Sequence, residues 1–169
     1  VNGKIEARVH PVFLPKGHPL ASVNGSFNAV FVTGDAVGDI MTYGRGAGAL
    51  PTGSAIVSDI IFCARQVEHA RYSEMYNEIK EEELVKDFES EYYVRLTVHD
   101  APGVLADITS VLKKYNISVS QIKQEKNHDI IPITFVTQKT HEFSMNEAIK
   151  QISELDHVIK VENVIRVEE

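Results

Sequence analysis

Cysteine is almost absent from this sequence, and its single cysteine, Cys63, has no partner for a disulfide within the chain. Proteins of oxidising compartments use disulfides, whereas thiols in the cytosol stay reduced, so we expect a cytoplasmic protein. Cys63 lies in an apolar stretch, and free cysteine is among the most frequently buried residue types. We therefore interpret Cys63 as a small core residue.

Basic clusters and long apolar runs are missing as well. Lys and Arg number 17 against 24 Asp and Glu, which gives a net charge of -7 and a pI near 5.5. Binding to phosphate backbones needs grouped Lys and Arg, so we expect no nucleic-acid partner. No apolar run approaches the roughly 20 residues of a membrane-spanning helix, and no charged-then-apolar leader opens the chain. We expect neither membrane insertion nor secretion.

Several catalytic signatures are absent too. The seven histidines are scattered and form no i, i+4 pair, so we expect no metal site. No nucleophile-elbow motif supports a Ser/His/Asp triad. No GxGxxG fingerprint follows a strand, so the chain does not include a dinucleotide-binding domain. With 169 residues, 43% of them hydrophobic, an acidic enzyme or sensor with one large or two modest cores remains.

Glycine is concentrated in one stretch, residues 44–54, with the sequence GRGAGALPTGS. Backbone without Cβ atoms tolerates sharp turns and close approach by a ligand. An apolar helix is expected directly afterwards, with Thr52 or Ser54 as its cap. Its expected apolar face consists of Val57, Ile60, Ile61, Ala64 and Val67. Free amides at such a helix start suit an anion.

The preceding residues predict strands without a complete core. Residues 5–10 alternate apolar and polar side chains before Pro11 and Pro15, which predicts a half-buried strand over much of residues 5–14. Residues 27–33 and 39–43 predict a hairpin. The near-continuous apolar runs AVFV and IVSDII indicate burial on more than one side, which these few elements cannot supply. We expect the missing surface to come from an upstream part of the chain, a second subunit, or both.

Residues 68–91 are strongly acidic and contain few apolar side chains. We interpret residues 68–90 as a helical extension that ends in a solvated linker, with a domain boundary there. The alternative is a charged helix face with no boundary.

The remaining residues, 91–169, follow a regular alternation of strand and helix patterns. Val94, Leu96 and Val98 alternate as in a strand, and Pro102 suits the first position of the following helix. Ser144 and Glu147 form a capping-box pattern before the second helix. The expected strands are residues 92–98, 117–124, 131–137 and 158–167, and the helices follow residues 102 and 144. Pro132 belongs at the start of its strand or at a bulge. The order is βαββαβ, with two helices on one face of an antiparallel sheet.

At HDAPGVLADITSVLKKYNISV this half of the chain resembles the ACT domain, a βαββαβ module that senses amino acids in biosynthetic enzymes. The residues that match the family's pattern are Asp100, Pro102, Gly103, Val104, Leu105 and Asn116. The resemblance implies an effector site at a domain interface, where the amides of residues 103–105 meet the ligand carboxylate. A helix N-terminus attracts such a group. Asp100 either pairs with the ligand's ammonium group or caps the helix.

Residues 3–67 resemble the carboxyl-terminal part of the catalytic region of homoserine dehydrogenase, through RVHPVFLPKGHPL and GRGAGALPTGSAIVSDI. The resemblance implies an NAD- or NADP-dependent enzyme that interconverts L-aspartate semialdehyde and L-homoserine on the route to threonine and methionine. Threonine is the expected feedback effector. The cofactor-proximal residues that it implies are Gly46, Ala47 and Gly48, with Pro51 and Thr52 shaping the turn. Arg45 replaces a proline common in the family, and either reaches a phosphate or points to solvent.

Together these patterns predict an α+β fold of three parts. A partial antiparallel or mixed sheet with one long helix spans residues 1–67, an acidic linker spans 68–90, and a ferredoxin-like ACT domain spans 91–169. The family's cofactor domain and catalytic lysine are expected upstream of Val1, so the chain alone should be inactive. We expect at least a dimer. The alternative is a non-catalytic amino-acid sensor whose first block is a dimerisation scaffold.

Overall fold

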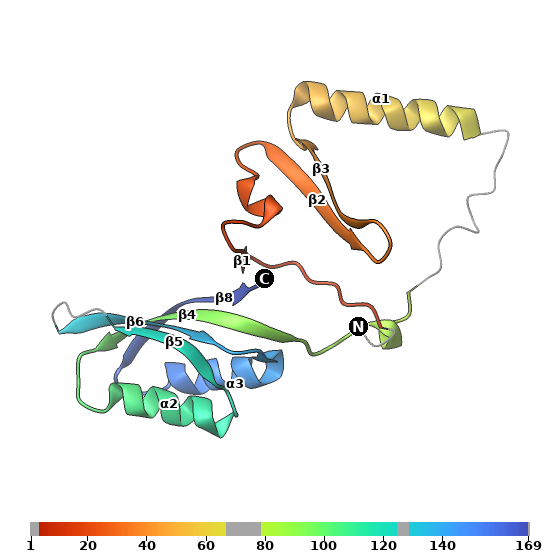
Figure 1. Ribbon diagram of the computed structural model, residues 1–169. Helices are drawn as coiled ribbons and strands as arrows, with labels where there is room; N and C mark the ends of the chain where they lie inside the picture. Colours follow the sequence, from red (N-terminus) through yellow and green to blue (C-terminus); the bar gives the residue numbers. More distant parts are fainter. Residues whose placement is uncertain (1–3, 67–78, 125–128, 169) are drawn as a thin grey trace. The chain divides into compact units, whose positions relative to one another are not determined.

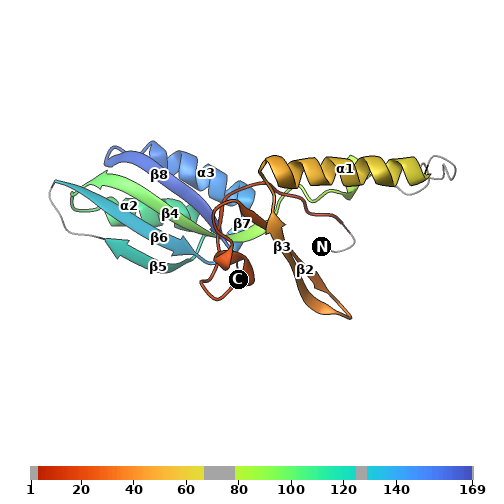
Figure 2. The same ribbon diagram turned by 90° about the horizontal axis from the view of Figure 1, so that it is seen from above.

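The computed structural model describes residues 4–66, 79–124 and 129–168. The chain forms two compact units (Figures 1 and 2). Unit 1 combines Val1–Phe13 with Lys80–Glu169, and unit 2 is Leu14–Ile79. The residues up to Phe13 therefore belong with the βαββαβ half, a grouping that the sequence pattern does not indicate. The limits expected at residues 67 and 91 stay predictions.

Unit 1 contains the predicted βαββαβ order, which the structure confirms. Its strands run in the spatial order β8-β4-β6-β5, and neighbouring strands are antiparallel. Both helices lie on the same side of this sheet (Figure 1). The elements are β4 (Glu89–His99), α2 (Val104–Lys114), β5 (Val119–Gln124), β6 (Ile130–Thr137), α3 (Glu142–Ser153) and β8 (Val158–Val167), with the short β7 (Thr140–His141) before α3.

The core of unit 1 follows from the two-residue period of its strands. Alternate side chains of β4 and β6 point to the helix side and are almost fully buried, as are the apolar stripes of α2 and α3. These residues include Val94, Leu96, Val98, Ile131, Ile133, Phe135, Ile108, Met145 and Ile152. The intervening side chains of the strands lie on the opposite, helix-free face of the sheet.

Both helices of unit 1 begin at residues other than those expected. The expected helix start at Pro102 is wrong, because α2 begins at Val104 and Gly103, in a left-handed conformation with φ of 98°, is its N-cap. Gly103 supplies this conformation without the strain that a Cβ would add. Pro132 is the third residue of β6, near the start of its strand as predicted.

The predicted capping box of Ser144 and Glu147 is also wrong, because α3 begins at Glu142. The amide of Glu142 donates to the Phe88 carbonyl (2.9 Å), and the amide of Phe143 donates to the Asp87 carboxylate (3.2 Å). A distant carboxylate therefore caps this helix in place of the local serine.

Residues 4–13, here called the strap, cross unit 1 with little strand structure. The predicted strand over residues 5–14 is wrong for most of its length, because only a bridge from Ile5 to Leu84 and β1 (Val12–Phe13) pair with other segments. The amide of Ile5 donates to the Glu83 carbonyl, and β1 is parallel to the end of β8. Pro11 lacks an N–H group for a continuous ladder. The strap nevertheless adds a parallel edge to the sheet.

Arg8 is the main polar attachment of the strap. Its guanidinium donates to the hydroxyl of the buried Ser90 (3.0 Å) and pairs with Glu6 (2.6 Å) and Glu168 (3.3 Å). It also lies over the ring of Phe88, 5.0 Å from the ring centroid. These contacts hold the strap against β4 and the end of β8.

Charged groups are concentrated beside the strap. Arg166 donates to Glu142 and lies over the ring of Tyr92. Burial alone would lower the pKa of Arg166, but its hydrogen bond to Glu142 and its electrostatic interactions with Glu142 and Tyr92 raise this pKa above its usual value. Burial and the Glu142 charge raise the pKa of Tyr92. Burial, followed by the charges of Arg166 and Arg8, lowers the pKa of His10.

Unit 2 contains the predicted hairpin and helix. The hairpin is formed by β2 (Phe27–Gly34) and β3 (Gly38–Arg45), paired from Phe27 with Arg45 to Gly34 with Gly38. A 3-10 helix, η1 (Pro19–Ser22), precedes it. The helix α1 (Ala49–Gln66) begins before Thr52 and Ser54, so their predicted role as caps is wrong. The expected helical extension at residues 68–78, and Val67 on the apolar face, lie outside the described residues.

None of the described residues of unit 2, 14–66 and 79, is buried within this chain. Apolar side chains of α1 are exposed in this chain, since Ile60 is 62% and Leu50 87% exposed. Cys63 is exposed as well, so its interpretation as a core residue is wrong for this chain, because no described element covers the helix there. No helix of the described part is long and apolar enough to cross a membrane.

The strap provides a first testable prediction. Arg8→Ala removes its bond to the buried Ser90 and should weaken the attachment by about 1 kcal/mol, which is roughly fivefold in a local opening equilibrium. Hydrogen exchange should then become faster by that factor at the amides of Val85 and Glu168, which donate to strap carbonyls. The matched control is Lys139→Ala, at an exposed cation outside the strap. Unchanged exchange at both amides in the Arg8 variant would contradict this role.

Candidate functional site

The turn between β4 and α2 borders a hollow of about 480 Å³. The structure brings five of the six predicted effector residues together there, since Asp100, Pro102, Gly103, Val104 and Leu105 all line it. The other lining residues are His99, Ala101, Gln124, Ile131 and Ile133. The hollow therefore lies where three strands end or begin beside the N-terminus of α2.

The backbone of this turn leaves donors available at the helix start. The amide of Asp100 donates to the Asp129 carbonyl (2.9 Å), which anchors the turn to the segment before β6. The amide of Val104 makes a long bond to Ala101 (3.4 Å). The first amides of an α-helix have no acceptor within the helix, so those of Gly103 and Leu105 suit a ligand's oxygen atoms. The positive end of the helix dipole adds attraction for a carboxylate.

The side chains of the hollow supply the complementary chemistry. Asp100 is exposed, and α2 begins without a side-chain cap, so the capping alternative for Asp100 is not observed. Its carboxylate suits an ammonium group. Ile131 and Ile133 are nearly fully buried and present an apolar wall. An anion-binding helix start, a carboxylate and an apolar wall together match the three parts of an α-amino acid.

Asn116 does not join these residues. It follows the last turn of α2 with a positive φ of 57°, and the amide of Ile117 donates back to the Leu112 carbonyl (2.9 Å). Asparagine tolerates this left-handed conformation better than most residues, so the end of helix α2 is sufficient to explain an asparagine at this position. Asn116 lines a separate hollow of about 320 Å³ with Thr109 and Lys113.

The glycine-rich turn of unit 2 leads from β3 into α1. A Cβ at Gly46 would lie 1.6 Å from the amide nitrogen of the Asn28 side chain, so this close approach requires glycine or a displacement of Asn28. Gly48 has a φ of 122°, which side chains disfavour. The amide of Thr52 donates to the Gly48 carbonyl (3.0 Å), and Pro51 has no N–H. The amides of residues 48–50 therefore remain to face an anion.

The structure separates the predicted cofactor residues into two places. Gly46 lines a shallow hollow of about 270 Å³ on the hairpin with Asn28 and Arg45, whereas Ala47, Gly48, Pro51 and Thr52 lie at or near the start of α1. Arg45 donates to the Ser26 hydroxyl (3.1 Å). Its guanidinium also lies over the Phe27 ring, 4.8 Å from the ring centroid. Arg45 is thus held against the hairpin in this chain.

Sequence reasoning missed several residues of these sites, among them Ile131, Ile133, Gln124 and Asn28. Ile131 and Ile133 alternate along a predicted strand, so their period placed them on the helix side but not at the effector turn. Gln124 and Asn28 carry no local signal, because only the pairing of strands brings them to the sites. Within the described ranges, no group of three or more His, Cys, Asp or Glu residues is arranged to hold a metal.

Comparison with protein families matches both halves of the chain separately. Residues 1–61 match the model described as homoserine dehydrogenase, and residues 92–156 match the ACT domain. These matches follow the order in which the sequence resemblances occur.

Individual relatives match the two halves together. The homoserine dehydrogenase of Corynebacterium glutamicum is 37% identical over 97% of this chain and 37% of its own length. The homoserine dehydrogenase of Neisseria gonorrhoeae is 38% identical, with 97% of this chain and 40% of its own length covered. The chain therefore spans about two fifths of the length of the curated relatives that it matches.

Solved structures give the same result. The crystal structure of a homoserine dehydrogenase from Thiobacillus denitrificans superposes with a TM-score of 0.77 at 35% identity, covering 99% of this chain and 40% of that one. Homoserine dehydrogenase from S. aureus, solved at pH 6.0, gives a TM-score of 0.52 at 29% identity over 94% of this chain and 36% of that one. The chain thus combines a segment of the homoserine dehydrogenase family with an ACT domain.

Proposed function

We propose that this chain is the sensor-bearing part of an NAD- or NADP-dependent homoserine dehydrogenase, which interconverts L-aspartate semialdehyde and L-homoserine. The proposal rests on one observation. A relative of that name aligns with both halves of this chain, in order, over 97% of the length of this chain. A separate ACT sensor with an unrelated scaffold would not require the first half to match this family.

The glycine-rich turn fits the edge of a nucleotide site. The nicotinamide cofactor supplies the hydride chemistry, and this chain's contribution is to bind and orient. The close packing of Gly46 on Asn28 and the free amides at the start of α1 suit an anionic phosphate. The dinucleotide fingerprint is not in this sequence, so residues 46–52 form only one side of the proposed cofactor site.

The hollow at the turn between β4 and α2 is the proposed effector site, and threonine is the proposed effector. The amides of Gly103 and Leu105 receive its carboxylate, Asp100 pairs with its ammonium group, and its short side chain lies towards Ile131 and Ile133. Regulation requires that the effector bind one conformation of the enzyme more tightly than another.

Amino-acid binding is the first function to test. Calorimetry of this polypeptide with threonine should give a binding signal, and Asp100→Asn should weaken it about fivefold by removing the charge that faces the ammonium group. Gly103→Val should abolish the signal, because a side chain strains the backbone at the positive φ of this residue and so alters the turn.

The control for backbone strain is Gly25→Val, which places the same side chain at another residue with a positive φ, in unit 2. This variant should bind threonine as the parent chain does. Flat titrations with threonine, methionine, isoleucine and serine would reject the effector site and leave the ACT domain as a structural module.

Catalysis is tested by a chimera in which this chain replaces the matched part of the C. glutamicum enzyme. The chimera should oxidise homoserine with NAD or NADP, whereas this polypeptide alone should not, because it lacks the dinucleotide fingerprint. Gly48→Val should raise the KM for the nucleotide about tenfold through strain at the start of α1.

Gly17→Val is the control for the chimera, since no atom lies within 4 Å of the Cβ that it adds. A chimera that is folded and binds threonine but has no dehydrogenase activity would support the non-catalytic sensor. Turnover by the isolated chain would show instead that the cofactor site is complete within it.

We also propose that the protein is a homo-oligomer, because residues 14–66 bury none of their described side chains within one chain. Light scattering should give at least a dimer, and Ile60→Glu on the exposed face of α1 should shift the population towards monomer. Lys16→Glu, on an exposed loop, serves as a charge control. A parent chain that is monomeric at all concentrations would refute this assembly.

A further inference from the structure

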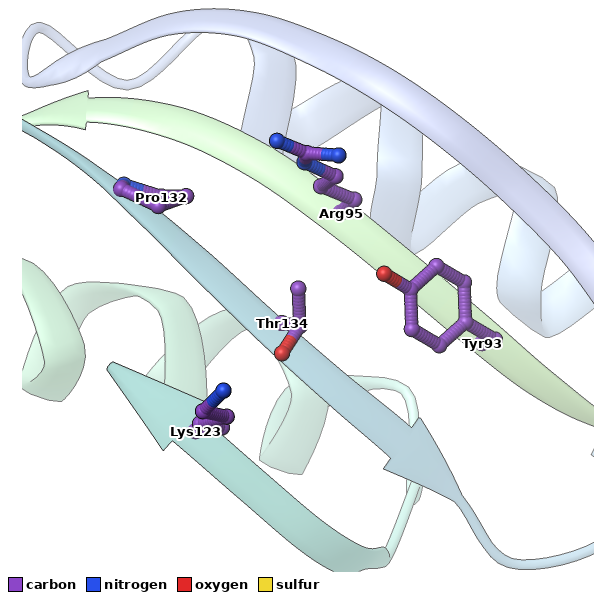
Figure 3. Close-up of a pocket in the computed structure, with 5 residues that line it drawn as sticks. All are labelled: Tyr93, Arg95, Lys123, Pro132 and Thr134. Atoms are coloured by element: carbon purple, nitrogen blue, oxygen red, sulfur yellow. The ribbon is translucent and has the colours of Figure 1, made fainter. Parts of the chain in front are cut away.

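The helix-free face of the sheet in unit 1 carries a second hollow of about 480 Å³ (Figure 3). It is lined by Tyr93 and Arg95 of β4, Pro132 and Thr134 of β6, and Lys123 of β5. None of these five residues belongs to the proposed effector site. The proposed functions leave this hollow unassigned.

Strand register places three of these side chains in one row. Arg95 is paired with Thr134 across β4 and β6, and Thr134 is paired with Lys123 across β6 and β5. Directly paired residues project to the same face of a sheet, so two cationic side chains flank one hydroxyl group. Figure 3 shows the three side chains arising from three neighbouring strands.

Tyr93 and Pro132 extend the row into a cradle. Each lies two positions from a member of the row on its own strand and therefore shares its face. Tyr93 also packs edge to face on Phe13 of the strap, with ring centroids 5.2 Å apart, which limits the freedom of its ring. Two rings thus supply apolar surface beside the cations and the hydroxyl.

The charge of this hollow is opposite to that of the protein. Acidic residues outnumber basic residues 24 to 17 in the chain, yet the lining includes two cations and no carboxylate. Glu162 accepts hydrogen bonds from Lys160 (2.7 Å) and the Thr97 hydroxyl (3.1 Å), and its charge also interacts with that of Arg95. Two neighbouring cations raise the local positive potential, which favours an anion.

The sheet separates this hollow from the effector turn. Along β6, Ile131 and Ile133 line the effector hollow, whereas the alternate residues Pro132 and Thr134 line the second one. The two sites therefore lie on opposite faces of the same strand. The effect of a substitution on one face can therefore be measured while the side chains of the other face stay the same.

We propose that this hollow binds a small oxyanion, a carboxylate or a phosphate, whose charge lies between Arg95 and Lys123. The guanidinium presents paired donors that match such a group, and Lys123 and Thr134 supply further donors. Tyr93 and Pro132 accommodate the apolar part of the ligand. The site is independent of the amino-acid site and of the dehydrogenase activity.

Amide and side-chain NMR titration of the whole polypeptide tests this site, with inorganic phosphate and succinate as separate probes. Both probes should shift signals of Arg95, Lys123 and Thr134. If only one of the two probes saturates the site, that result shows whether phosphate or carboxylate is preferred. Arg95→Gln and Lys123→Gln should each raise the dissociation constant about fivefold. Lys139→Gln, which removes an exposed cation outside the hollow, should leave it unchanged.

Two results would overturn the proposal. One is the absence of saturable shifts with either probe. The other is an equal loss of binding in the Lys139 variant, which would show a general response to charge. Because these residues lie on the helix-free face, threonine binding at the effector turn should be the same in the Arg95, Lys123 and parent chains. The spectra of the free variants report directly whether each remains folded.

Discussion

The pairing of β4 with β8 on one side and β6 on the other is the constraint on which unit 1 depends. Alternate residues of this strand fill the core, and those between them form the polar hollow. Its end leads into the turn proposed as the effector site, and its beginning lies beside the strap and Asp87, which caps α3. A shift of register by one residue would exchange the two faces, burying Arg95 and exposing Leu96, and would cost both the core and the sites.

Unit 2 differs from unit 1, because it has regular backbone structure without a core. An isolated hairpin is at best marginally stable in water, and the entropy lost on ordering a chain must be offset by burial. No described side chain of residues 14–66 is fully buried within the chain. The exposed isoleucines of α1 therefore give the physical reason to expect covering surface, whether from a second copy or from further polypeptide of the family's enzymes.

Sequence periodicity predicted the elements of unit 1 because each carries its own signal. Val94, Leu96 and Val98 show the two-residue period, and the local pattern from Asp100 to Leu105 marks the turn that is proposed as the effector site. The errors arose where distant residues decide. Asp87 displaces Ser144 as the cap of α3, the strap pairs at two separated points, and Asn28 meets Gly46 only through the hairpin register. Cys63 was misassigned because its apolar helix has no cover in this chain.

The strap is one of the two connections between unit 1 and unit 2. Unit 2 is joined to unit 1 at both of its ends, through Phe13 and through Lys80, and β1 attaches the first of these connections to β8. β8 in turn pairs with β4, whose last residue, His99, lines the proposed effector hollow. An effector that altered the pairing of these strands would therefore act on the chain that enters unit 2 without any additional interface. Such an effect can be no larger than the difference in effector affinity between the two arrangements of the strands.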